Sequence, residues 1–130
     1  QDISIPEDIA DLSFEFVPTE YEPPGEIVIQ LGHRDVHLGG FKHKVKQQVI
    51  KKLTAGDHLF TGEQENTLYN SAGREALYFS NRFSTEIEEK WLNKGYRIES
   101  AQARFILVWK DRTEEKEYRI VLPSLRLHAQ

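Results

Sequence analysis

The chain has 130 residues, of which 38% are hydrophobic and 29% are charged, and it contains no Cys. This length and composition are typical of one globular domain, and they exclude a wholly disordered chain, disulfide bonds and Cys-ligated metal sites. The net charge of −4 conceals a separation of charge: the first thirty residues carry eight acidic and no basic side chains, whereas residues 31–130 have a net charge of +4. Such a separation indicates pairing with a partner or within the protein.

The acidic residues 1–25 form one expected segment. A capping-box pattern at 4–7 predicts a short helix, and a stretch rich in proline at 18–25 predicts a loop. Between them, apolar residues alternate with polar ones, which predicts a half-buried strand. We expect this strand to dock on the body of the protein or on a neighbouring molecule through its three apolar side chains, Leu12, Phe14 and Phe16.

Residues 26–130 are expected to form a single domain. Strands are predicted at 27–31 and, in a short form, around 36–38. Apolar residues four apart then predict an amphipathic helix over 41–54. Its apolar stripe is expected to contain Phe41, Val45, Val49 and Leu53.

The middle of the chain is less regular. Residues 55–75 are polar and predict mostly loop, and 76–80 fits either a strand or the beginning of a helix. A helix is predicted over 84–94, because Ser84 is a favourable N-cap residue and Gly95 a favourable residue to follow the last turn.

The C-terminal part predicts a long hairpin. A strand is expected over 96–110, and its alternation changes phase at 100–103, which indicates a bulge or a bend. Residues 105–109 are apolar on both faces and therefore predict the centre of a covered sheet. Residues 118–122 are expected to return as the hairpin partner and to end at Pro123. A short edge strand is expected at Leu125 and Leu127.

Together these elements predict an α+β fold, with a mostly antiparallel sheet of about 4–6 strands and two main helices packed on one face. The uncovered face of residues 105–109 requires a cover. We expect it to come from residues 12–16, from the loop 55–75 or from a second subunit.

A cluster of basic residues surrounds the first predicted helix. Such side chains bind a phosphate backbone without reading sequence, so they indicate a nucleic-acid or polyanion site. The alternative is a solvated helix face or a protein contact. The residues of this predicted site are Arg34, Lys42, His43, Lys44, Lys46 and Lys51.

Two weaker patterns concern metals. His33, Asp35 and His37 would share one face of an extended strand, and two imidazoles with a carboxylate suit Zn²⁺ or Fe²⁺. Asp111 and the stretch 114–117 have the residue types of a metal-dependent nuclease, but they fall in a predicted hairpin turn. At both places we favour the simpler interpretation that these polar residues face water. We therefore expect neither a bound metal nor a cofactor.

No catalytic signature is present, so the favoured function is that of a non-enzymatic binding or assembly module. In this hypothesis the acidic N-terminal segment docks on a protein partner or on a neighbouring subunit of a homo-oligomer. The alternatives are a nucleic-acid-binding domain that uses the basic helix and, third, a nuclease-like enzyme. Deleting residues 1–25 should weaken assembly in the first case and strengthen nucleic-acid binding in the second.

Two further expectations concern location. No apolar run approaches the length of a membrane span, so we expect a soluble protein without membrane contact and favour the cytoplasm. Because the chain begins at Gln1 and contains no Met, we also expect it to be a processed or excised piece.

Overall fold

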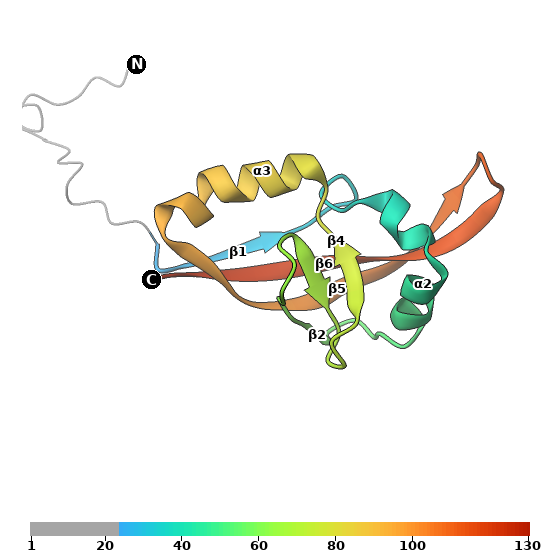
Figure 1. Ribbon diagram of the computed structural model, residues 1–130, viewed down its shortest axis with the longest axis horizontal. Coiled ribbons are helices and arrows are strands. Elements are labelled where there is room, and N and C mark those ends of the chain that lie inside the picture. Colours follow the sequence, from blue (N-terminus) through green and yellow to red (C-terminus); the bar gives the residue numbers. More distant parts are fainter. Residues whose placement is uncertain (1–23) are drawn as a thin grey trace, which may run out of the picture.

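The computed structural model describes residues 24–130, and its centre is a four-stranded antiparallel sheet (Figure 1). The strand order is β1-β6-β5-β2, with β1 at Glu26–Gln30, β2 at His58–Leu59, β5 at Tyr96–Asp111 and β6 at Lys116–Ala129. This architecture confirms the predicted α+β class. The elements predicted within residues 1–23, and with them Leu12, Phe14 and Phe16, lie outside the described residues.

A two-stranded antiparallel sheet accompanies the main one. Its strands are β3 (Thr67–Tyr69) and β4 (Glu75–Tyr78), so residues 55–75 contain more structure than the predicted loop. The stretch 76–80 is therefore largely strand. Val36, expected in a short strand, makes only an isolated bridge with Phe79.

The helix predicted over 41–54 is divided. A 3-10 helix, η2 (Leu38–Lys42), is followed by α2 (Lys44–Lys51), and His43 between them is extended, with φ −67° and ψ 133°. The break takes Phe41 and Val45 out of one continuous stripe: Phe41 is buried, whereas Val45 is 59% exposed. The buried residues of α2 follow helical spacing and are Lys46, Val49 and Ile50.

The second helix, α3 (Asn81–Lys90), begins earlier than predicted. The Ser80 hydroxyl oxygen accepts a hydrogen bond from the Phe83 backbone N–H at 3.1 Å, so Ser80 and not Ser84 is the N-cap. Ser84 lies inside the helix. None of the helices within residues 24–130 has the length and apolar character needed to cross a membrane.

The chain leaves α3 as predicted. A 3-10 turn, η3 (Leu92–Lys94), ends at Gly95, whose φ of 96° lies in the left-handed region that favours glycine. Trp91 packs edge-on against Tyr96, with ring centroids 5.1 Å apart.

The core joins both helices to one face of β6. Val121, Leu125 and Leu127 of β6 are buried, whereas Arg126 and His128, which point to the other face, are exposed. The largest buried helix side chains in this core are Phe41, Ile50, Phe83 and Ile87.

The hairpin of β5 and β6 runs the length of the molecule (Figure 1). Its register shifts between Ile98 and Ser100 and again between Ala103 and Phe105, which confirms an irregularity near the predicted position. Pro123 does not end β6, contrary to the prediction. The strand tolerates Pro123 because the backbone of this residue faces the end of β1 and not β5, so its missing N–H costs no bond to β5. Its carbonyl oxygen accepts from the Leu31 N–H at 3.0 Å.

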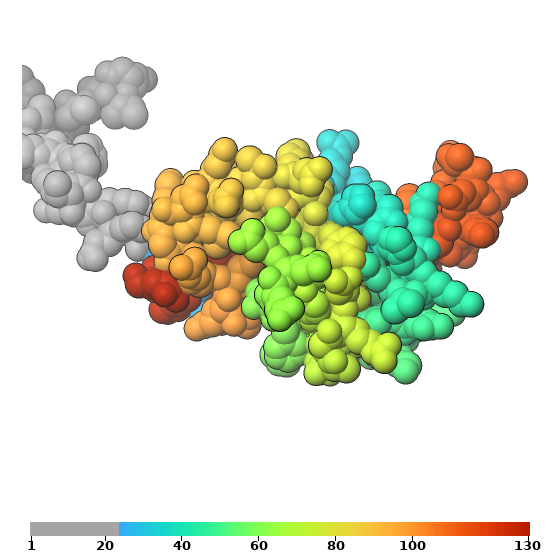
Figure 2. All heavy atoms as spheres, viewed as in Figure 1, coloured from blue at the N-terminus to red at the C-terminus, as the bar shows by residue number. Residues whose placement is uncertain are grey.

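The prediction that residues 105–109 lie in a covered sheet is wrong. Strand β2 pairs only with Ala101 and Gln102, so β5 continues beyond it with β6 as its one strand partner. We call this part of the hairpin, residues 105–122, the arm. Figure 2 shows its end standing out from the rest of the described molecule.

Candidate interaction surface on the arm

One edge of the arm is closed by a side chain. The Gln47 amide of α2 donates to the Arg119 carbonyl oxygen at 2.9 Å and accepts from the Arg119 N–H at 2.9 Å. Its second N–H bond, at 2.6 Å, goes to the Phe41 carbonyl oxygen. Gln47 thus does for β6 what a neighbouring strand would do, and it fixes α2 against the arm.

These bonds show how the backbone of the arm is oriented. Arg119 lies opposite Val108, and its backbone groups point away from β5 toward Gln47. In an antiparallel ladder, opposite residues either both bond across the pair or both point outward. The N–H and C=O groups of Val108 therefore point away from β6, as do those of Ile106 and Lys110, two residues to either side.

These outward groups form what we call the open edge: the backbone of Ile106, Val108 and Lys110. No group within residues 24–130 hydrogen-bonds to them. Unpaired strand edges of this kind accept an additional strand, and natural proteins usually shorten, cover or charge them.

The side chains around the open edge are apolar on both faces. Phe105 and Leu107 are each 43% exposed and project to one face, while Val108 is 64% exposed and projects to the other. Exposed apolar side chains that gather at one place indicate an interaction site.

Three cations accompany this apolar surface. Arg104, Lys110 and Arg112 are exposed, and none forms an ion pair with another residue of the described range. The Arg104 guanidinium lies 4.3 Å from the centroid of the Phe105 ring. The open edge therefore lies among apolar side chains and three exposed cations, within an arm whose four basic and four acidic side chains balance.

The tip of the arm is pinned to η2 by an ionic cluster. Lys42 forms an ion pair with Asp111 and lies 3.3 Å from a Glu114 carboxylate oxygen, and the Tyr118 hydroxyl donates to the other Glu114 oxygen at 2.7 Å. The Lys42 ammonium also lies 5.6 Å from the ring centroid of Trp109.

The cluster shifts the titration of its members. The hydrogen bond from Lys42 lowers the pKa of Asp111, and the bond from Tyr118, followed by that from Lys42, lowers the pKa of Glu114. The hydrogen bond to Asp111 raises the pKa of Lys42, and the bond to Glu114 raises the pKa of Tyr118. The carboxylates at this turn therefore serve to hold the arm.

The predicted phosphate-binding residues are separated by the structure. Lys46 is buried rather than projecting: its ammonium lies 3.8 Å from the centroid of the Tyr78 ring and 3.5 Å from a Glu75 oxygen. Lys42 belongs to the ionic cluster. The four remaining residues are exposed, namely Arg34, His43, Lys44 and Lys51.

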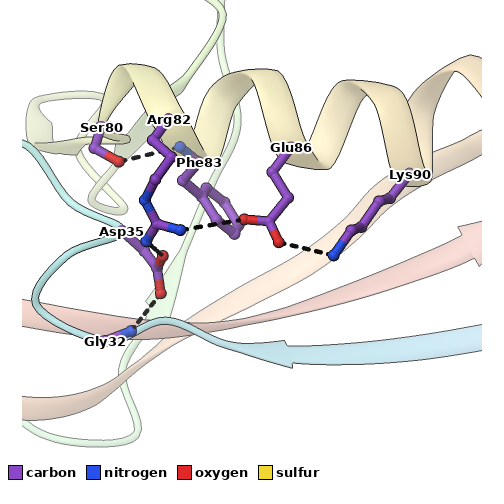
Figure 3. Close-up of polar contacts among 7 residues, drawn as sticks. All are labelled: Gly32, Asp35, Ser80, Arg82, Phe83, Glu86 and Lys90. Carbon is purple, nitrogen blue, oxygen red and sulfur yellow. Dashed lines mark hydrogen bonds and ion pairs between the residues drawn. The ribbon is translucent and has the colours of Figure 1, made fainter.

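The group around Asp35 holds α3 (Figure 3). One Asp35 oxygen accepts from the Gly32 N–H at 2.8 Å, and the other accepts from Arg82 at 2.9 Å. Arg82 also lies 3.7 Å from Glu86, which pairs with Lys90 at 2.9 Å. This row of alternating charges links α3 to the loop before it. No set of three His, Asp or Glu side chains suited to a metal occurs within residues 24–130.

A hollow of about 580 Å³ lies between the loop before β3 and α3. Ser84, Thr85, Glu88 and Arg97 are among its lining residues. Histidine is not among them, and no hydrogen bond within residues 24–130 joins a hydroxyl of this hollow to a side-chain base. The hollow therefore indicates no reaction class.

Sequence reasoning missed the open edge and the role of Gln47. The apolar run 105–109 was visible in the sequence, but the open edge beside it arises because β5 has sixteen residues and β2 has two, which the sequence did not show. Gln47 gave no signal, because an amide on a helix is ordinary. Comparison of the chain with family models, curated proteins and solved structures finds no match.

Proposed function

We propose that this chain is a non-enzymatic binding and assembly module. Its acidic N-terminal segment, residues 1–25, docks on a protein partner or on a neighbouring subunit through Leu12, Phe14 and Phe16. The observation that carries the proposal is the open edge of the arm, where exposed apolar side chains and the cations Arg104, Lys110 and Arg112 suit an acidic segment that contains alternating apolar residues.

The charges of the two regions support this pairing. The first thirty residues contain eight acids and no base. The arm and its base carry three cations without an ion pair in the described part of the chain, Arg104, Lys110 and Arg112. Opposite charges at separate positions favour association and make it dependent on salt.

The test replaces the three apolar residues of the segment within the full chain, as Leu12→Ser, Phe14→Ser and Phe16→Ser together. Solution mass is measured by light scattering over a range of concentrations. We expect the unaltered chain to exceed its monomer mass of 15.1 kDa and the triple variant to remain at it. A triple variant that assembles like the unaltered chain would refute the proposed role of the segment.

A nucleic-acid role remains the second candidate. It is favoured by the exposed cations Lys44 and Lys51, which have no ion pair among residues 24–130. It is weakened because Lys42 and Lys46 already neutralise carboxylates. Titration of a random oligonucleotide at low salt, with Lys44→Gln and Lys51→Gln as the variant pair, distinguishes this function from assembly.

A further inference from the structure

We infer that the open edge of the arm receives residues 12–16 of a second copy of this chain as an added β-strand. The inference rests on the proposed function and deepens it by naming the receiving surface and the partner. Its first support is the backbone. Ile106, Val108 and Lys110 together present three N–H and three C=O groups at alternate positions, which is the spacing that a strand of five residues pairs with.

The side chains of the two strands also match. A strand in which Leu12, Phe14 and Phe16 share one face would place them beside Phe105 and Leu107, which are each 43% exposed. Its other face carries Ser13 and Glu15.

That polar face lies on the side of the sheet that holds Val108 and Lys110. Glu15 can then approach Lys110, which is exposed and has no ion pair within residues 24–130. Opposite charges on neighbouring strands stabilise pairing by about 0.2–1 kcal/mol.

The same charges disfavour pairing between two arms. If two open edges met, the exposed cations Arg104, Lys110 and Arg112 of each copy would come close to those of the other. Like charges on neighbouring strands destabilise a sheet, so an acidic strand is the better occupant.

The length of the chain indicates that the donor is a second copy. Gly25 lies beside Ala129, which pairs with Tyr96, so the N-terminal segment begins at the end of the hairpin opposite the arm. From Pro24 back to Phe16 the chain spans at most about 28 Å. Tyr96 and Ile106 are roughly 26 Å apart along the sheet, because their partners Ala129 and Val121 are eight residues apart on β6, and an added strand would lie about 14 Å across the sheet from β1, so the direct path is roughly 30 Å. The segment of the same copy therefore falls short of the open edge, and donation between copies builds chains or rings.

The competing receiver is the outer edge of β1. Leu31 bonds to Pro123, and Gly25 to Ala129, so the alternate residues Glu26, Val28 and Gln30 point their backbone groups away from β6. This edge presents as many outward residues as the open edge, but it carries a carboxylate, Glu26, which pairs with Arg126. An acidic strand should avoid it, and it supplies a matched control.

The experiment compares Val108→Pro with Val28→Pro in the full chain. Both residues are exposed valines whose N–H points outward, so proline removes a donor from an edge and leaves the bonds to β6 intact. We expect Val108→Pro to weaken self-association by about tenfold or more and Val28→Pro to leave it unchanged. Circular dichroism and thermal unfolding verify that both variants are folded.

Mixing gives the decisive result. The Leu12→Ser, Phe14→Ser, Phe16→Ser chain retains an intact open edge, and the Val108→Pro chain retains an intact segment. We expect each alone to be a monomer of 15.1 kDa and the mixture to form a one-to-one complex of twice that mass.

Each other outcome has a defined meaning. If the triple variant fails to assemble but Val108→Pro assembles normally, the proposed function stands and the receiving surface is overturned. Loss of assembly in Val28→Pro alone assigns the receiver to β1 and also overturns the inference. If the unaltered chain is a monomer at all concentrations, donation between copies is excluded, and only binding to another protein remains.

Discussion

The two ends of the β5–β6 hairpin both contain apolar residues, but these residues have different surroundings. Near Leu125 the hairpin has β1 on one side and β2 on the other, and the side chains that face the helices are buried. Near Val108 its one strand partner is β6, and apolar side chains remain exposed. Apolar sequence therefore stabilises the fold at one end and is available for binding at the other.

The difference arises from the lengths of the flanking strands. β6 has fourteen residues, whereas β1 has five and β2 has two. Neither short strand reaches the arm. On the β6 side of the arm, the Gln47 side chain bonds to the backbone of Arg119 instead. An edge left open opposite one that a side chain closes at Arg119 is expected where a partner strand is added.

The largest expected effect contrasts one leucine at each end. Leu125→Ala should lower the free energy of unfolding by about 2–5 kcal/mol, because Leu125 is fully buried in the core. Leu107→Ala should cost about 1 kcal/mol or less, because Leu107 is 43% exposed. Urea unfolding of both variants measures the difference, and equal losses would show that the arm is covered in solution.

A smaller effect is expected at the buried cation of α2. Lys46→Met should lower the free energy of unfolding by about 1–2 kcal/mol, because the cation–π contact with Tyr78 and the pairing with Glu75 are lost. Lys44 lies two residues before Lys46 and is exposed, so Lys44→Met is the control and should change the free energy of unfolding by about 0.5 kcal/mol or less. A phosphate-binding role for Lys46 predicts instead a stable variant with reduced oligonucleotide binding.

Local patterns predicted much of the fold. Alternation located β1, β5 and β6, and Gly95 marked the end of the second helical region. These features depend on neighbours in sequence, so the sequence contains them. Residues 41–54 contain no Gly or Pro that would predict the break at His43. A continuous helix was therefore expected, which placed Val45 in the core and Lys46 at the surface.

The candidate site depends on the lengths of the neighbouring strands, which the hydrophobic pattern of the sequence does not contain. An apolar run predicts that side chains avoid water, but whether they are covered depends on the lengths of other strands. The two-residue β2 lies in a region without periodicity, so the exposure of Phe105 and Val108 was not predictable. The charge separation was visible in the sequence, and the structure adds an open edge with exposed cations beside it.

The closed edge of the arm gives the next prediction. Gln47→Ala should lower the free energy of unfolding by about 1 kcal/mol, because the Arg119 N–H and C=O lose their partner and the second edge is exposed. Gln48→Ala is the matched control, since Gln48 is the next residue, is exposed and makes no side-chain hydrogen bond within residues 24–130. Hydrogen exchange of the Arg119 amide should accelerate in the first variant alone.

The smallest effect concerns the pinning of the arm at low pH. Asp111 and Glu114 have lowered pKa values, so their contribution to stability is complete above their ordinary values of 3.8 and 4.5 and is lost as the pH falls through the lowered ones. Lys42 and Tyr118 have raised pKa values, so their contribution is lost only as the pH rises through values above 10.5 and 10.0. Between these limits the arm should stay pinned.

The fluorescence of the two tryptophans can distinguish the response of the arm to acid from that of the far end of the hairpin. Trp109 lies beside Lys42 on the arm, and Trp91 packs on Tyr96 at the far end. With Trp91→Phe, the remaining fluorescence of Trp109 should change in acid before the far-ultraviolet circular dichroism does. With Trp109→Phe, the two signals should change together, and the early change should be absent from Asp111→Asn. An early change that persists in Asp111→Asn would show that Asp111 is not the carboxylate that responds, and one that also persists in Glu114→Gln would leave the arm without its proposed anchor.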